Sequence, residues 1–169
     1  NFERNSTLIN DLSGKNNDGT RLNGVNWTTG GKLGNGMSFD GTDDRINLSK
    51  PASLNFERTN NFTYSAWIKR KTTANSFDEI ITNEQDTTTF GGINFYISNT
   101  NLTSVVLRST TTNFINVAGS GVTINDTNWH HVAFTYNGTS NATGVAIYTD
   151  GVLISKNIIT DSLTTTILS

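Results

Sequence analysis

The sequence contains no cysteine, a single proline and only 15% charged residues. Without cysteine there can be no disulfide framework, no thiolate metal site and no cysteine nucleophile. The formal net charge is −2 at pH 7, and the 12 basic residues are mostly scattered, so neither nucleic acid nor an acidic membrane surface is indicated as a partner. No apolar run reaches the roughly 18 residues of a membrane-spanning helix, so we expect no membrane insertion.

Asparagine and threonine are abundant, with 24 and 28 of the 169 residues. Threonine suits solvent-facing strand positions and asparagine suits turns, so the composition predicts an all-β protein with many loops and few helices. A chain of this length can bury a sizeable core. Because Asn1 is not an initiator methionine and no signal peptide follows it, we expect a processed product, an excised domain or the ordered part of a longer protein.

Two stretches carry the clearest strand patterns. In Asn61–Lys69, apolar residues on one face alternate with polar residues and Trp67 on the other. In 128–156, a strand with the same period is followed by two apolar runs around Asp150-Gly151, which predicts a two-residue type I′ hairpin. Further short strands are expected about every ten to twelve residues, the spacing of an all-β sandwich, at 37–40, 45–48, 79–82, 93–97, 105–109 and 114–118. Phe39, Ile46 and Leu48 are expected to point inward.

Three stretches in combination resemble the concanavalin A-like lectin/glucanase superfamily, and more narrowly its laminin-G-like, pentraxin-related branch: LGNGMSFDGTDDRINL, NNFTYSAWIKRKTT and NWHHVAFTYNGTSNATGVAIYTDGVLI. The resemblance implies a two-sheet antiparallel jelly roll that often carries calcium near one edge and often binds glycans or other proteins. We therefore expect one domain over 1–169, with a looped lead-in over 1–36 and the sandwich strands over 37–169.

The usual ending of the family is missing from this sequence. After a strand expected at Thr165–Leu168, members continue into further strands that complete the sheets, and the fold class expected here is a jelly roll lacking its final strands. An open strand edge invites association. We expect the edge near 165–169 to pair with another chain, in a homo- or hetero-oligomer, or with further sequence.

Catalysis has no support in the residues. The glucanase motif Glu-x-Asp-x-x-Glu, which supplies the two carboxylates of a glycosidase, is absent. Glu79 and Glu84 would point to opposite faces if one continuous strand held them. His130 and His131 are adjacent, so a regular strand cannot direct both to one metal. We predict that the protein is not an enzyme and assign no catalytic residue, with glycoside hydrolysis the least supported function.

Calcium is the one cofactor that the residues suggest. This ion takes six to eight oxygen ligands, commonly from carboxylates and carbonyls in loops. Two loops offer such ligands, and the candidates are Asp40, Asp43, Asp44, Glu84 and Asp86. The alternative interpretation is that Asp40 and Asp43 cap turns and that the loop at Glu84–Asp86 is solvated.

A glycan site would combine an aromatic platform with polar donors and acceptors. The aromatic candidates are Phe77, Phe90, Tyr96 and Phe114, each of which could equally be a core residue. We predict a non-catalytic binding module of an exterior protein, extracellular, on a cell surface or on a virion, that recognises glycans or other proteins through loops of the sandwich. The alternative is a structural or decoration protein in which the sandwich makes chain-to-chain contacts.

Overall fold

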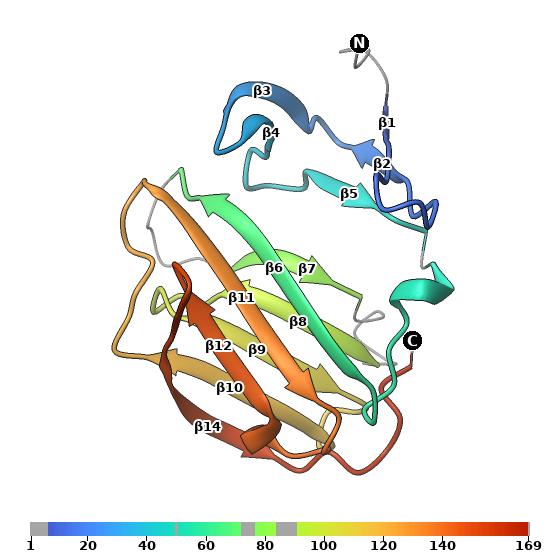
Figure 1. Cartoon of the computed structure of the whole chain (residues 1–169), viewed down its shortest axis with the longest axis vertical. Coiled ribbons are helices and arrows are strands. Elements are labelled where there is room, and N and C mark those ends of the chain that lie inside the picture. Colours follow the sequence, from blue (N-terminus) through green and yellow to red (C-terminus); the bar gives the residue numbers. More distant parts are fainter. Residues whose placement is uncertain (1–6, 50, 72–76, 84–90, 169) are drawn as a thin grey trace. The chain divides into compact units, whose positions relative to one another are not determined.

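The computed structural model describes residues 7–49, 51–71, 77–83 and 91–168, which form two compact units, 1–55 and 56–169 (Figure 1). Strands dominate both units. The helices of the described ranges are two short 3-10 segments, η1 (Ala52–Leu54) and η2 (Ala142–Gly144). None of the described helices has the length and apolar character that a membrane span requires.

The first unit contains a three-stranded sheet, in the order β1-β2-β5, and a separate hairpin of β3 and β4. Their bounds are β1 (Leu8–Ile9), β2 (Gly19–Leu22), β3 (Asn26–Gly31), β4 (Gly34–Ser38) and β5 (Arg45–Asn47). The sequence predicts sandwich strands from residue 37 onward, whereas β5 and the residues after it up to Asn55 belong to this first compact unit. The single domain over 1–169 stays a prediction.

Side-chain hydrogen bonds hold much of this first unit together. The Asp11 carboxylate accepts the backbone N–H groups of Asn17 and Ser13 at 2.9 and 2.8 Å, which closes the loop between β1 and β2 and lowers the pKa of Asp11. Val25 is the one hydrophobic residue in the described part of the unit that is fully buried. Phe39 and Leu48, expected to point inward, are 45% and 38% exposed, so that expectation is wrong for both.

The second unit is an antiparallel β-sandwich of two sheets, in the orders β14-β10-β9-β8-β7 and β13-β12-β11-β6. Figure 1 shows β6, β11 and β12 in one layer and the five-stranded sheet in the other. The bounds are β6 (Asn61–Lys69), β7 (Asp78–Thr82), β8 (Gly92–Ile97), β9 (Thr103–Arg108), β10 (Phe114–Ser120), β11 (Trp129–Asn137), β12 (Val145–Thr149), β13 (Val152–Leu153) and β14 (Ser155–Asp161). The expected all-β antiparallel fold class is confirmed.

The local signals in the sequence explain these strands. Alternation directs the apolar side of β6 toward the core, and β6 pairs with β11 along its full length. Asp150 and Gly151 have φ values of 51° and 80°, so both central positions of the β12–β13 turn are left-handed, as a type I′ turn requires. The predicted hairpin is therefore confirmed.

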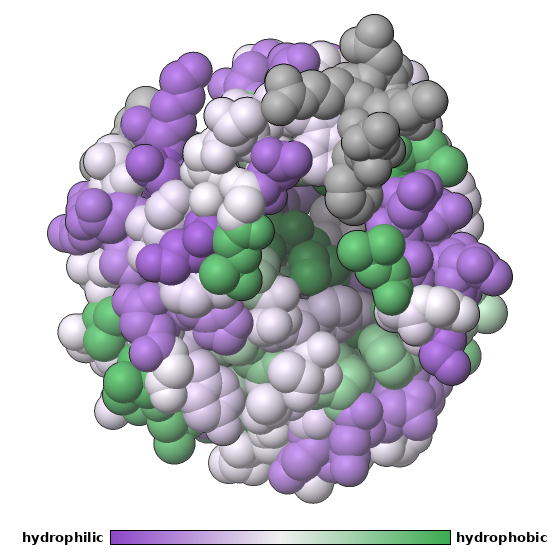
Figure 2. Space-filling view, turned by 45° about the horizontal axis from the view of Figure 1, so that its top comes forward, coloured by the Kyte–Doolittle hydropathy of each residue, from purple (hydrophilic) through white to green (hydrophobic). Residues whose placement is uncertain are grey.

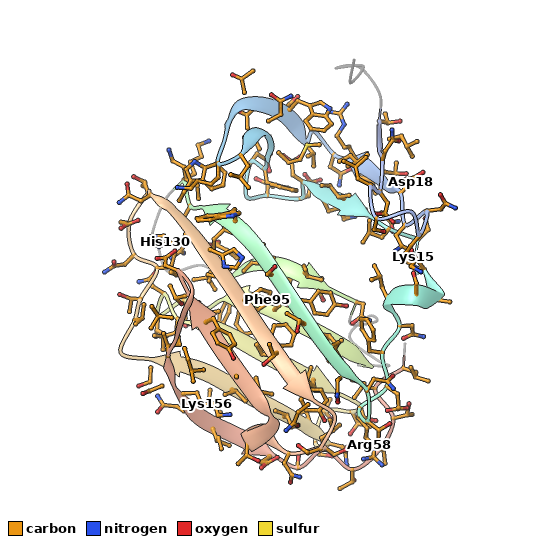
Figure 3. All side chains as sticks on the ribbon, in the orientation of Figure 1. Lys15, Asp18, Arg58, Phe95, His130 and Lys156 are labelled. Carbon is orange, nitrogen blue, oxygen red and sulfur yellow. The ribbon has the colours of Figure 1, made fainter. Side chains whose placement is uncertain are left out.

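The core lies between the two sheets of the second unit. Figure 3 places Phe95 there, where its ring centroid lies 5.0 Å from that of Phe134 on the opposite sheet. Both residues are fully buried, and each such side chain contributes roughly 1.5–3 kcal/mol through burial. The core residues of β8, β9 and β10 share one face of the five-stranded sheet. They are Ile93, Phe95, Ile97, Val105, Leu107, Ile115 and Val117. The other face of this sheet is therefore available for function.

The segment after β14 differs from the sequence-based expectation. Residues 165–168 form no strand, so the predicted strand Thr165–Leu168 is wrong. The backbone N–H groups of Thr164 and Thr165 donate to Asn113 Oδ1 at 3.0 and 3.2 Å, and Leu163 and Ile167 are buried in the core. The expected oligomer contact near 165–169 stays a prediction, but the open strand on which it was based is absent from 165–168.

Hydrophobic residues on the surface form separate groups. Figure 2 shows a face on which hydrophilic and weakly polar residues predominate, with hydrophobic residues between them. The most exposed large hydrophobic side chains of the second unit come from several elements: Phe77, Val152, Leu153 and Ile159.

Candidate ligand-binding face

The candidate site is the face of the five-stranded sheet that points away from the core, called the outer face below. Cross-strand pairing places its central residues in register. Val106 on β9 lies between Asn116 on β10 and Asn94 on β8, and Asn94 in turn pairs with Thr82 on β7. The neighbouring row contains Ala118, Ser104, Tyr96 and Glu79. Amide, hydroxyl and aromatic groups thus meet on one surface.

Short side chains form the floor of this face. The residues on this floor point away from the core but are nearly buried: Ser104 is 1% exposed, Val106 3% and Ala118 7%. Longer side chains on the adjacent strands must therefore rise around them. A ligand lying over β9 would therefore contact mainly the longer side chains around these positions.

Aromatic side chains stand at both ends of the outer face. At one end, the rings of Phe77 and Tyr96 have centroids 5.9 Å apart. At the other end, the Arg108 guanidinium lies 4.8 Å from the centroid of Phe114, a cation–π contact. Tyr96 pairs with Ser104, which lies four residues before Arg108 on β9. The two ends are therefore separated by roughly 13 Å.

Two buried acceptors on this face lack partners. Asn94 Oδ1 and Asn116 Oδ1 have almost no exposed surface and no hydrogen bond within the described residues. Asn94 does use its amide nitrogen, which donates to Glu79 Oε1 at 3.3 Å. An unpaired buried acceptor costs about 1–3 kcal/mol, so the face holds two acceptors that a donor-bearing ligand would satisfy.

The structure brings three of the four predicted aromatic residues, Phe77, Tyr96 and Phe114, to this one face, whereas Phe90 lies outside the described residues. Their positions differ from the prediction in one respect, because strands contribute as much to the face as loops do. Sequence reasoning missed Asn94, Asn116 and Arg108. The signal available was their alternation with core residues in β8, β9 and β10.

The three acidic residues between β4 and β5 also come together. Ligand oxygens of Asp40, Asp43 and Asp44 lie within 4.8 Å of one another. Turn capping is also present, since Asp40 Oδ1 accepts the Thr42 N–H and Asp44 Oδ2 accepts the Asp40 N–H, each at 2.8 Å. The other predicted calcium ligands, Glu84 and Asp86, lie outside the described residues. Calcium binding stays a prediction.

The two histidines have separate structural roles. His130, near the start of β11 (Figure 3), has Nδ1 2.8 Å from Asp150 Oδ2 and Nε2 3.0 Å from Asp126 Oδ1. Burial alone would lower the pKa of His130, but the hydrogen bonds to the two carboxylates outweigh it and raise the pKa. The His131 ring instead lies 5.2 Å from that of Trp67. The prediction that the two side chains point different ways is confirmed.

A laminin G family model, described as the concanavalin A-like lectin/glucanases superfamily, matches residues 40–167. The chain belongs to this superfamily. The match covers the described sandwich strands from β6 to β14 and extends back to Asp40 in the first unit. No curated protein and no solved structure matches the chain. Membership of this concanavalin A-like superfamily indicates a binding module.

Proposed function

We propose that this concanavalin A-like domain is a non-catalytic module that binds neutral glycans on the outer face of its five-stranded sheet. The observation that carries the proposal is the pair of unpaired, buried acceptors Asn94 Oδ1 and Asn116 Oδ1 on either side of Val106. Sugar hydroxyl groups are donors of the kind that would satisfy them. A face built from amides, a low apolar floor and aromatic rings is the usual composition of a small-ligand site.

The ends of the face suit a chain of sugar rings. Phe77 with Tyr96, and Phe114 with Arg108, supply aromatic surfaces on which the apolar side of a sugar can pack. The separation of roughly 13 Å between these ends fits an oligosaccharide better than a single sugar. Glu79 is the only carboxylate of the described outer face and Arg108 offsets its charge, which favours a ligand without net charge.

The same face supports a role without catalysis. A glycosidase needs two carboxyl groups flanking the scissile bond. Within the described residues, Glu79 has no second carboxylate beside it on the outer face, since the neighbouring Asp78 bonds to the buried Arg70 through Nε at 2.6 Å. The proposal includes an exterior location, at a cell surface or on a virion, because glycans of this kind are displayed there.

Calcium is a further part of the proposal, at Asp40, Asp43 and Asp44. Support comes from the close approach of three carboxylates in one turn and from Asp44 Oδ1, a buried oxygen without a hydrogen bond in the described residues. Calcium favours carboxylate oxygen in such loops. The ion would add positive charge where three negative charges meet.

The test is glycan-array screening followed by calorimetric titration of the best neutral oligosaccharide. Replacing both amides, Asn94→Ala with Asn116→Ala, should weaken binding by about 5- to 160-fold, since each lost hydrogen bond contributes roughly 0.5–1.5 kcal/mol. Thermal stability should fall little, because the variant removes two acceptors that the free protein leaves unpaired and one long, exposed hydrogen bond from Asn94 to Glu79 Oε1 at 3.3 Å. The matched control Asn61→Ala, on the outer side of the other sheet, should bind normally. Unchanged affinity in the double variant, or no glycan binding at all, would overturn the proposal.

A second candidate function is structural, with the sandwich making chain-to-chain contacts in a surface assembly. One observation favours it: β6 is a nine-residue edge strand with a strand partner on only one side in the described structure. An assembly role and glycan binding use different parts of the sandwich. They can therefore be tested separately.

A further inference from the structure

We propose that two copies of this chain pair through the edge of β6 that faces away from β11, antiparallel about a two-fold axis at Ser65. The inference concerns an edge of the four-stranded sheet and does not depend on glycan binding at the outer face. It would join two four-stranded sheets into one continuous sheet of eight strands.

The sandwich has four sheet edges, formed by β14, β7, β13 and β6. Natural sheets protect their edges with short strands, bulges and charged residues. β13 has two residues, and β7 and β14 each contain an irregularity in register with their neighbours. β6 has nine residues paired with β11 in unbroken register. Within the described chain, β6 is the edge that lacks these protections.

The core side of β6 is incompletely covered. Tyr64, Ala66 and Ile68 point toward the core yet remain partly exposed. On the adjacent strand β11, Val132 and Phe134 are 0% exposed. An added strand beside β6 would cover Tyr64, Ala66 and Ile68, as β6 covers Val132 and Phe134.

The sequence of β6 is complementary to itself when reversed. A two-fold axis at Ser65 sets each residue opposite one of the other copy: Ser65 with Ser65, Tyr64 with Ala66, Thr63 with Trp67, Phe62 with Ile68, and Asn61 with Lys69. On the core side a large residue thus meets a smaller one. The one charged residue of the strand, Lys69, lies at its end and meets an uncharged Asn61.

Such a contact fits the rules of symmetric assembly. A two-fold interface uses the same patch on both copies, and pairs directly opposite in adjacent strands contribute roughly 0.2–1 kcal/mol each. The formal charge of −2 per chain adds little repulsion between copies. Backbone hydrogen bonds along nine residues supply the remaining affinity.

Charge reversal at Ser65 tests the register. Ser65 is exposed, so a substitution should leave the fold of a single copy intact. The wild-type chain should sediment at twice its 18.4 kDa at high micromolar concentration. Ser65→Lys sets two like charges opposite each other and should weaken the dimer by about tenfold or more, as should Ser65→Glu. Mixing the two variants should restore a mixed dimer, which also shows that both are folded.

Cysteine crosslinking gives an independent readout, since the natural chain has no cysteine. Directly opposite residues have Cα atoms about 4.5–5.5 Å apart, within disulfide range. Ser65→Cys should crosslink readily under mild oxidation. In the matched control Thr63→Cys, the two thiols would start roughly 13 Å apart and should crosslink far more slowly. A wild-type chain that stays monomeric, a dimer insensitive to Ser65→Lys, or equal crosslinking of the two cysteine variants would each refute the proposal.

Discussion

Lys156 offers a sharp test of how the sandwich is held together. Its ammonium donates to the backbone carbonyls of Ala142, Thr143 and Val145, with distances of 2.9 and 3.1 Å for the first two. These carbonyls belong to η2 and the start of β12. Burial lowers the pKa of Lys156, against the opposing effect of the Asp161 carboxylate. The variant Lys156→Met keeps the aliphatic stem and removes the ammonium.

The expected loss follows from these contacts. A hydrogen bond from a charged donor contributes roughly 1.5–3 kcal/mol, but the buried ammonium also gives up part of its hydration, so three bonds together give a net effect of about 2–4 kcal/mol. Ala142 and Val145 are 0% exposed, which limits the access of water to their carbonyls after the substitution. For a chain of this size, such a loss lowers the melting temperature by roughly 5–12 °C.

Urea unfolding at neutral pH, followed by circular dichroism, measures the difference in free energy. The matched control is Lys15→Met, which removes an exposed lysine in the loop between β1 and β2. Exposed substitutions of this kind change stability by about 0.5 kcal/mol or less. The reasoning fails if Lys156→Met and Lys15→Met unfold at the same urea concentration.

Two further predictions concern charge. Because the pKa of His130 is raised, its contribution to stability is fully present below the unfolded value near 6.5 and is lost as pH rises through the folded pKa. His130→Gln should therefore cost about 1 kcal/mol in urea unfolding at acidic pH and less at pH 9 or so, and a pH-independent difference would contradict the assigned ion pairs. Calcium at about 100 times its dissociation constant should stabilise the chain by roughly 2.7 kcal/mol. This gain in stability should disappear when a chelator is added and in the variant Asp43→Asn, and magnesium serves as the control ion. A calcium titration that releases no heat and does not shift the melting temperature would remove calcium from the proposed function.

The strands of the sandwich could be predicted because their signals are local. Alternation in β6 and β11 and the Asp150-Gly151 turn each specify structure within a few residues. The buried positions of the first unit could not be predicted in the same way. Its β5 has three residues, too few to define a buried face, and the expected inward positions Phe39 and Leu48 lie just outside β4 and β5 and are exposed.

The candidate site was only half predictable for a related reason. Aromatic residues such as Phe77 and Tyr96 attract notice in any sequence, and the structure places their ring centroids 5.9 Å apart. Asn94 and Asn116 are two among 24 asparagines. Whether an amide is buried and unpaired depends on the register of strands distant in sequence, which no local pattern encodes.

The pairing of β6 with β11 also bears on how the chain is made. β7 pairs with β8, β8 with β9 and β9 with β10, so these strands can form soon after synthesis, but β6 ends at Lys69 and β11 begins at Trp129. At about 5–20 residues per second, β6 leaves the ribosome roughly 3–12 seconds before its partner. During that interval both sides of β6 lack a partner strand, so a nascent chain of this protein should need its strongest chaperone protection over residues 61–69.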